Sequence, residues 1–366
     1  MVSIREKIVS WADSFLRPPL LGLDISDTSI KYLKFRSGQK LSFDAFGEIA
    51  IPPGVIVSGE IKDEEAFARV LNGWLAKEGR PLRSSFVAVS LPEEKSFFRV
   101  IQLPKVKIAD IGKAIRWEIE ANIPLPFEEL VYDYEVVDSF DEHLDHVDVV
   151  ISAFPKTIVD AYVRVLGGAG LRLACLELES QAIVRSVIPH FRDRLAKIII
   201  DIGRNRTGFT IFGSGVITFT KTVAVGGLML EEEIMKSLHV DSAHAASLKR
   251  EVGLDKKAEG GAVFQALVPG VAVLADELQR VVSYYQNHFE HPHGGTERLG
   301  EVLLAGGDAN LAGLDTYLGS VLKLPVRRVD PIESIRMRLV SPIPPFSKNQ
   351  ALAFATVIGL ALRGIR

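Results

Sequence analysis

The stretch Leu21-Gly-Leu-Asp-Ile-Ser-Asp-Thr-Ser-Ile-Lys31 decides the fold, because a second stretch repeats its pattern. That second stretch is Ile198-Ile-Ile-Asp-Ile-Gly-Arg-Asn-Arg-Thr-Gly208. Each is an apolar strand that ends in Asp-Ile, followed by a tight turn of small or polar residues and another strand. A third stretch, Val302-Leu-Leu-Ala-Gly-Gly-Asp-Ala-Asn-Leu-Ala-Gly-Leu314, places a glycine pair between a strand and an expected helix. The order of hairpin, hairpin and glycine pair predicts a duplicated fold with a ligand between its halves.

The chemistry of these turns favours a phosphate ligand. A turn directly after a strand exposes consecutive backbone N–H groups, which hold phosphate oxygens, and small residues let the backbone approach closely. Asp24 and Asp201, at the strand ends, should face each other across a cleft. Mg²⁺ prefers one or two carboxylates together with waters and phosphates. Hydroxyl donors should come from Thr28, Ser29 and Thr207.

Composition limits the class of protein. The 366 residues suffice for two or more domains, and 47% of them are hydrophobic. A formal net charge of -3 gives no support for bulk nucleic-acid binding. The single cysteine, Cys175, excludes an intramolecular disulfide and fits a reducing compartment. The longest apolar runs, Ala262–Ala275 and Ala351–Leu362, are shorter than the ~20 residues of a membrane-spanning helix. We therefore expect a soluble, cytoplasmic protein.

Hydrophobic periodicity predicts the order of elements. In the first half we expect strands at Leu20–Ile25, Ile30–Phe35, Leu41–Ile51 and Arg83–Leu91, with a helix at Asp63–Glu78. In the middle we expect strands at Val100–Leu103, Val131–Val137 and Val149–Phe154, with helices at Ile108–Asn122, Thr157–Gly168 and Glu177–Ile188. In the second half we expect strands at Lys197–Ile202, Gly208–Phe212, Val216–Val223 and Val326–Val329, and helices at Leu228–Leu238, Leu314–Leu322 and Gln350–Leu362. Residues Ser242–Phe289 should be mostly helical, and Met1–Phe15 should form a short amphipathic helix.

Common catalytic motifs are missing from the sequence. It contains no Gly-x-x-x-x-Gly-Lys-Ser/Thr loop, no His-Glu-x-x-His and no Gly-x-Ser-x-Gly. Each Asp-containing hairpin alone is ordinary turn chemistry, and a glycine pair alone could merely end a strand. The three stretches in this order are a much stronger signal.

Together the three stretches resemble the nucleotide site of the actin-like ATPase superfamily: two phosphate-binding hairpins and an adenosine loop. A closer resemblance is to the PilM-type family of type IV pilus assembly proteins. It is carried by Ala114-Ile-Arg-Trp-Glu-Ile-Glu-Ala-Asn-Ile-Pro-Leu-Pro126, by Tyr132-Asp-Tyr134, by Val302–Leu314 and by Ile358-Gly-Leu-Ala-Leu-Arg-Gly364.

The resemblance implies an α/β, actin-like (ribonuclease H-like) duplicated fold with an FtsA-like inserted subdomain. The implied units are an N-terminal segment 1–19, a first core 20–91 and 174–195, an insert 92–173, a second core 196–240 and 300–366, and a helical subdomain 241–299.

The resemblance also implies ATP or ADP binding with Mg²⁺ held through water by Asp24 and Asp201. The implied cofactor residues are Asp24, Ser26, Asp27, Thr28, Ser29, Lys31, Asp201, Gly203, Asn205, Thr207, Gly226, Gly227, Lys249, Gly306, Gly307 and Asp308. No residue stands out as a general base for hydrolysis.

Three positions depart from the family pattern. Ser26 replaces a glycine of the first turn, Asp308 replaces a third glycine of the adenosine loop, and Ala245-Ala-Ser247 replaces a glutamate that precedes Lys249. Ser26 gives up some backbone freedom. Asp308 would either accept a ribose hydroxyl or repel phosphate.

The implied partner is a PilN-like inner-membrane protein, gripped by its cytoplasmic N-terminal peptide in a groove between the first core and the insert. The candidate wall consists of Arg99, Ile101, Arg116, Ile123 and Leu125. We expect Trp117 in the subdomain core rather than at a binding surface. Two alternatives stay open: an actin-like enzyme, as an ATPase or small-molecule kinase, and an FtsA-like tether for cell division.

Overall fold

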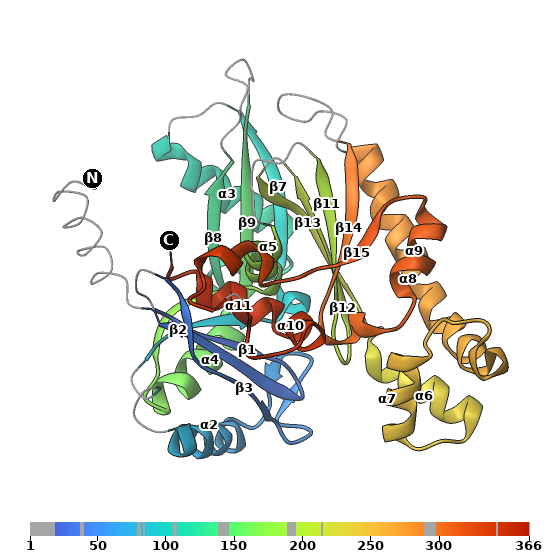
Figure 1. Cartoon of the computed structure of the whole chain (residues 1–366). Helices are drawn as coiled ribbons and strands as arrows, with labels where there is room; N and C mark the ends of the chain where they lie inside the picture. The colour runs from blue at the N-terminus through green and yellow to red at the C-terminus, as the bar shows by residue number, and fades with distance from the viewer. Residues whose placement is uncertain are drawn as a thin grey trace, which may run out of the picture.

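The computed structural model of the chain describes residues 19–36, 40–78, 82, 85–104, 108–137, 146–188, 195–213, 215–288, 298–341 and 343–365. The amphipathic helix expected at Met1–Phe15 lies outside these residues. Within them, the chain forms two five-stranded sheets, a three-stranded sheet, a two-stranded ribbon of β4 (Ile56–Val57) and β5 (Glu60–Ile61), and helices that pack on the larger sheets (Figure 1).

The two five-stranded sheets have the same strand order. The first runs β10-β6-β1-β2-β3 and the second runs β15-β14-β11-β12-β13. In both, the central strand pairs antiparallel with the following hairpin strand and parallel with the strand on its other side. The first sheet comprises β1 (Leu21–Ile25), β2 (Ser29–Arg36), β3 (Ser42–Ala50), β6 (Phe86–Leu91) and β10 (Arg172–Leu178). The second comprises β11 (Ala196–Ile202), β12 (Thr207–Gly213), β13 (Val216–Val223), β14 (Leu299–Ala305) and β15 (Val326–Arg328). The matched order confirms the predicted duplication.

Helices α5 (Glu179–Val187) and α11 (Ala355–Leu362) pack against each other between the halves. Side chains of α5 such as Ile183 and Val184 share a core with the second sheet. Helix α11 is buried on every side and lies along β1 and β2 of the first sheet. The expected closing helix at Gln350–Leu362 is two helices, α10 (Lys348–Ala353) and α11, separated at Phe354.

The insert has its own sheet, with strand order β7-β9-β8, and its own helix α3 (Ile108–Asn122). The strands are β7 (Phe97–Pro104), β8 (Leu130–Val136) and β9 (His146–Pro155). Ile115 and Ile119 of α3 fill a core against one face of this sheet. Trp117 points away from that core and is 76% exposed, so the expectation of a core tryptophan was wrong. It lies on the face of α3 opposite Ile115 and Ile119.

The two ends of the insert join the first core. Helix α4 (Lys156–Gly168), which falls within the expected insert 92–173, buries Tyr162 and Leu166 among side chains of the first sheet and of α2 (Glu64–Glu78). Residues 172–178 form β10, a strand that the sequence analysis did not predict, and they extend the first sheet beside β6. The helix expected at Glu177–Ile188 therefore begins two residues later, at Glu179.

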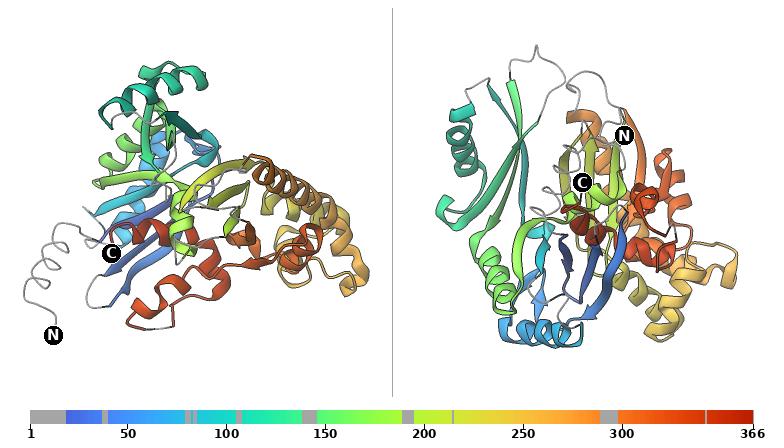
Figure 2. Two further views of the ribbon diagram at one scale, coloured as in Figure 1. Left: turned by 90° about the horizontal axis from the view of Figure 1, so that it is seen from above. Right: turned by 60° about the vertical axis from the view of Figure 1, so that its left-hand side comes forward.

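The second half carries the helices α6 (Gly227–Leu238), α7 (Ser242–Glu251), α8 (Ala262–His288) and α9 (Leu314–Leu322). Helices α6 and α7 extend from the side of the molecule opposite the insert (Figures 1 and 2). One helical stretch, Ala258–Asn287, is long and apolar enough to cross a membrane by length and composition. Its side chains Leu267, Leu274 and Leu278 are buried in the core that covers the second sheet, which accounts for its apolar face.

The crossing of α5 and α11 should depend on the missing side chain of Gly359. A Cβ atom there would lie 1.8 Å from the Ala182 carbonyl oxygen. We expect Gly359→Ala to lower the free energy of unfolding by about 3 kcal/mol, because the two backbones must separate. Urea unfolding monitored by circular dichroism measures the loss.

Gly73→Ala is the matched control, because Gly73 lies in the helix α2 and a Cβ there would meet nothing within 4 Å. It should stabilise the protein by about 0.5–1 kcal/mol through helix propensity alone. Equal effects of the two substitutions would contradict the proposed role of the helix crossing.

Candidate functional site

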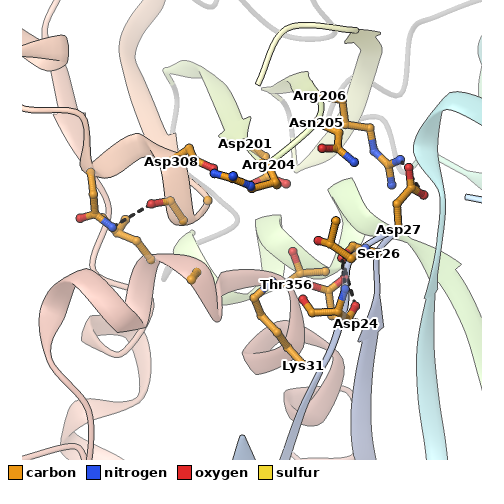
Figure 3. A pocket seen from close by; sticks show the side chains of 18 of the residues that line it. Asp24, Ser26, Asp27, Lys31, Asp201, Arg204, Asn205, Arg206, Asp308 and Thr356 are labelled. Atoms are coloured by element: carbon orange, nitrogen blue, oxygen red, sulfur yellow. Dashed lines mark hydrogen bonds and ion pairs between the residues drawn. The ribbon is translucent and has the colours of Figure 1, made fainter. Parts of the chain in front are cut away.

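A cavity of about 700 Å³ lies where the two hairpin turns meet, and both halves of the molecule line it (Figure 3). Of the cofactor residues expected from sequence, all except Thr207, Gly226 and Gly227 line this cavity. The three segments identified in the sequence thus converge on one space.

The first turn, between β1 and β2, is closed by Ser26. Its hydroxyl donates to the Ser29 carbonyl at 3.0 Å and accepts from the Ser29 amide at 3.1 Å. Ser26 is not among the residues with positive φ, so this position does not need glycine. The departure at position 26 therefore leaves the turn intact. Asp24 lies beside the turn, where its carboxylate accepts a hydrogen bond of 2.9 Å from Ser90.

The second turn, between β11 and β12, is supported from behind by the three expected residues that do not reach the cavity. The Thr207 hydroxyl donates to the Val225 carbonyl at 2.7 Å. A Cβ at Gly226 would lie 2.6 Å from the Arg204 carbonyl oxygen, and the Gly227 amide donates to the Gly203 carbonyl at 3.0 Å. These residues hold the turn in place from outside the cavity.

The glycine pair closes against the second turn. Gly306 has a φ of 89°, and a Cβ there would lie 2.5 Å from a carboxylate oxygen of Asp201 and 2.3 Å from the Ile202 carbonyl oxygen. Glycine is required here by both conformation and space. The strand end that carries Asp201 and the glycine pair are therefore in direct contact.

Asp24 and Asp201 face each other from the two halves. Burial, and next the charge of Asp24, raise the pKa of Asp201 to about 6, while Lys31 and Arg206 act in the opposite direction. Two carboxylates that repel each other at the end of a cavity are a donor set that suits a hydrated Mg²⁺. Among the described residues, no group of three or more Asp, Glu, His or Cys side chains is arranged to hold a metal directly. The donor set therefore fits a cation that keeps most of its waters.

A second charged cluster surrounds Arg206, which the sequence analysis did not name. Its guanidinium pairs with Glu94, with Glu179 at 3.2 Å and with Asp27 at 3.9 Å. Burial opposes the charge of Arg206, but Glu179, Glu94 and Asp27 raise its pKa above the ordinary value.

Glu179 is the first residue of α5 and lines the cavity. Burial raises the pKa of Glu179 to about 8; Arg206 counteracts this rise, and Asp24, Glu94 and Asp201 add to it. A carboxyl group with a pKa near neutrality, next to a cavity, could exchange a proton with a bound water. The sequence alone did not indicate this group, because Glu179 follows β10, a strand that was not expected.

Lys249 and Asp308 form the far wall of the cavity. Lys249 is 3% exposed, and its ammonium group donates to Glu231 at 2.6 Å and to Asp308 at 2.5 Å. Arg204 also pairs with Glu231, at 2.6 Å. The negative charge of Asp308 is therefore balanced within the protein, and Glu231 of α6 supplies a glutamate beside Lys249. Because both carboxylates bind cations, repulsion of phosphate by Asp308 is much reduced.

The five expected partner residues lie on the insert but do not line a common groove. Arg99 and Arg116 are exposed, Ile123 is buried in the core beneath α3, and Ile101 and Leu125 pack at its margin. Arg116 is held on its own helix and turn by Glu120 at 2.8 Å, and its guanidinium lies over the Phe127 ring.

A groove of about 730 Å³ lies on the other face of the insert sheet. Its walls are β8 and β9 of the insert, β10 and α5 of the first core, and the ends of β12 and β13. Glu177, Arg185 and Arg363 form an ion-pair cluster in its wall. None of the five expected partner residues lines this groove.

The comparisons with known proteins agree with this geometry. The family described as type IV pilus assembly protein PilM matches residues 22–365. The chain belongs to the PilM family. A solved structure described as a PilM-PilN type IV pilus biogenesis complex superposes with a TM-score of 0.79 at 24% identity, covering 96% of this chain and 99% of that one.

More distant relatives share the fold. MreB5 of Spiroplasma citri bound to ADP superposes with a TM-score of 0.55 at 14% identity, covering 93% of this chain and 94% of that one. The cell division protein FtsA of Bacillus subtilis is 23% identical over 69% of this PilM-family chain and 64% of its own length. The FtsA of Neisseria meningitidis is 23% identical over 63% and 62%. The chain thus spans less than two thirds of these curated relatives, and the fold is actin-like.

The contact between Gly227 and Asp308 can be tested directly. A Cβ at Gly227 would lie 2.0 Å from an Asp308 carboxylate oxygen, which Lys249 holds in place. We expect Gly227→Ala to lower the free energy of unfolding by about 1–3 kcal/mol, because the carboxylate must leave its ion pair. In an Asp308→Gly background the same substitution should cost almost nothing.

A double-mutant cycle in urea measures this coupling. Additive effects of the two substitutions would contradict the contact.

Proposed function

We propose that this PilM-family chain binds ATP in the cavity between its halves and acts as a scaffold that grips a PilN-like membrane partner. One observation carries the nucleotide part of the proposal: two carboxylate-ended hairpins and a glycine pair, far apart in the sequence, line one cavity. The backbone N–H groups of the two turns are suited to phosphate oxygens.

The nucleoside would lie at the other end of the cavity. One face of α7 lines it there with Ala243, Ala246 and Lys249, opposite Gly307 and Leu311. Small and apolar side chains on both walls suit a flat base. The Asp308 carboxylate beside Lys249 would accept a ribose hydroxyl, one of the two roles that the sequence left open.

Asp24 and Asp201 would hold Mg²⁺ through water, which would neutralise phosphate charge in a cavity that is already rich in carboxylates. A cation between them would also relieve the repulsion by Asp24, which adds to burial in raising the pKa of Asp201.

For the partner, we propose that the groove beside β8 takes the cytoplasmic N-terminal peptide of the PilN-like protein. β8 is an edge strand of the insert sheet, so an extended peptide can add to it by main-chain hydrogen bonds. Val131, Phe98 and Val159 offer apolar contacts, and Arg363, which is 43% exposed and paired with the buried Glu177, offers a charge. A chain held in this way would lie at the cytoplasmic face of the inner membrane.

ATP with Mg²⁺ should raise the melting temperature of the protein, because a ligand that binds only the folded state stabilises it by mass action. Asp201→Ala should abolish this gain and Asp24→Ala should weaken it. Differential scanning fluorimetry at millimolar ATP measures both. An unchanged melting curve of the unsubstituted protein would contradict nucleotide binding.

Nucleotide binding should also depend on pH. The pKa of Asp201 is raised to about 6, so its carboxyl group stays protonated in the free folded protein up to about that pH. The folded protein therefore loses stability as the pH rises from the ordinary pKa of an aspartate towards 6. Mg²⁺ needs the ionised carboxylate, so the affinity for MgATP should rise about tenfold between pH 5 and pH 7. Calorimetry in buffers of different ionisation enthalpy should detect the proton released near pH 6. Asp201→Asn is the control that should remove the release, and a release that persists in it would assign the proton to another group.

The groove and the helix wall make different predictions for the partner peptide. Val131→Glu, on a residue that is 41% exposed in the groove, should weaken the peptide at least about tenfold, because a charge replaces an apolar contact. Arg116→Glu, outside the groove, should leave its affinity unchanged. Fluorescence anisotropy with a synthetic peptide measures affinity, and thermal melting confirms that both variants fold. The reverse result would move the peptide to the wall formed by Arg116 and Leu125.

A further inference from the structure

Two arginines of the second turn, Arg204 and Arg206, are two residues apart but pair with different halves of the molecule. Arg204 binds Glu231, which belongs to the same half. Arg206 binds Glu94, Glu179 and Asp27, which all belong to the first half. Arg206 is therefore the residue of this turn that ties the two halves together at the wall of the cavity.

Three carboxyl groups share the one guanidinium of Arg206. Among the described residues, one carboxylate oxygen of Glu94, Oε2, is buried with no hydrogen-bond partner. The Arg206 side chain is 17% exposed and lines the cavity between the two turns, where the phosphates of a bound nucleotide would lie. A guanidinium can donate two parallel, charge-assisted hydrogen bonds to one phosphate group. Such a pair is stronger than a single hydrogen bond to a carboxylate. Phosphate and the three carboxylates would thus compete for one cation.

Two of these carboxylates belong to the junction that also forms the groove. Glu94 lies in the short helix η1 (Glu93–Lys95), directly before β7 of the insert. Its neighbour Glu93 accepts hydrogen bonds from the amide and hydroxyl of Ser180 at 3.2 and 3.0 Å, which joins η1 to the start of α5. Gln181, Val184 and Arg185 of α5 line the groove.

The third carboxylate leads to the groove by another route. Asp27 accepts hydrogen bonds from the amides of Ser58 and Gly59 at 3.1 and 2.9 Å. The Gly59 carbonyl accepts a hydrogen bond of 2.9 Å from Tyr162 of α4, and Val159 of the same helix lines the groove. Both routes are built from packed, hydrogen-bonded groups.

We infer that Arg206 binds the terminal phosphate of the bound nucleotide, and that this contact changes the affinity of the groove for the partner peptide. With no terminal phosphate, Arg206 stays on Glu94 and Glu179 and fixes the position of η1 and α5. With the terminal phosphate present, the Arg206 guanidinium turns to the phosphate. The junction formed by η1 and α5 then loses its ion pairs to the second half. This inference rests on the proposed function, since it needs both a nucleotide and a peptide.

The effect must be reciprocal, because coupling between two binding sites changes both affinities by the same factor. We expect the dissociation constant of the peptide to differ at least about fivefold between the protein bound to a non-hydrolysable ATP analogue and the protein bound to ADP. The probe is a synthetic peptide of the cytoplasmic N-terminal residues of the PilN-like protein encoded in the same genome. Fluorescence anisotropy with saturating nucleotide and Mg²⁺ measures the ratio.

The decisive variant is Arg206→Gln, which should bring this ratio to within about twofold of one. Arg204→Gln is the matched control from the same turn, and it should keep the ratio whatever it does to nucleotide affinity, because its partner lies within the second half. If Arg206→Gln does not fold, as judged by thermal melting, Glu94→Gln tests the same contact from the other side and should also lower the ratio.

Amide hydrogen exchange of residues 93–97 and 178–188 gives a readout without the peptide. The ATP analogue should speed exchange there relative to ADP in the unsubstituted protein and not in Arg206→Gln.

The outcomes separate the two proposals. Nucleotide and peptide that both bind the unsubstituted protein, but with a ratio within twofold of one, would overturn the inference and leave the proposed function standing. A full ratio in Arg206→Gln would do the same. An unsubstituted protein that binds no nucleotide or no peptide would overturn the proposed function, and the inference with it.

Discussion

Carboxylates from both halves are crowded into the space where the halves meet, and this crowding is the constraint on which the site depends. Asp24 and Asp201 face each other, and Glu179 lies close enough for both to raise its pKa. Such a cluster is unfavourable unless cations balance it. Arg206 lies at one end of the cavity and Lys249 at the other, and each of them pairs with at least two carboxyl groups. A magnesium nucleotide would bring both further phosphate charge and a cation to this balance.

The duplicated fold makes this arrangement possible. Because the two sheets have the same strand order, equivalent turns emerge at equivalent edges, and the helices α5 and α11 between the sheets bring those edges together. The close approach at Gly359 and Ala182 fixes the spacing of these helices. The packing of α5 on α11 thus determines how closely the carboxylates of the two halves approach each other.

The sequence predicted those parts of the molecule that local pattern controls. The paired hairpins, the glycine pair and α3 follow from periodicity and turn chemistry, and most residues of the expected site do line the cavity. What the sequence did not predict depends on contacts between distant segments. Arg206 and Glu179 become partners only when β10 joins the first sheet and brings α5 to the cavity.

Some errors have the same origin at a smaller scale. Trp117 is a large apolar side chain of the kind found in cores, but it lies on the outward face of α3. Which face of α3 packs on the sheet determines this exposure. For Asp308 the sequence left two roles open, because the ion pair with Lys249 that bears on them comes from a helix almost sixty residues away. The position of Gly227, which leaves room for that carboxylate, also follows only from the folded structure.

The edge strand β8 has a consequence for how two copies of the protein meet in solution. Exposed sheet edges are templates for pairing with another chain, including a second copy of the same chain. Asp133 and Glu135, two positions apart along β8, both line the groove. If two copies joined through this edge in antiparallel fashion, carboxylates of one strand would meet carboxylates of the other, which is destabilising. The strand is therefore open to a foreign peptide with a different charge pattern while discouraging its own aggregation.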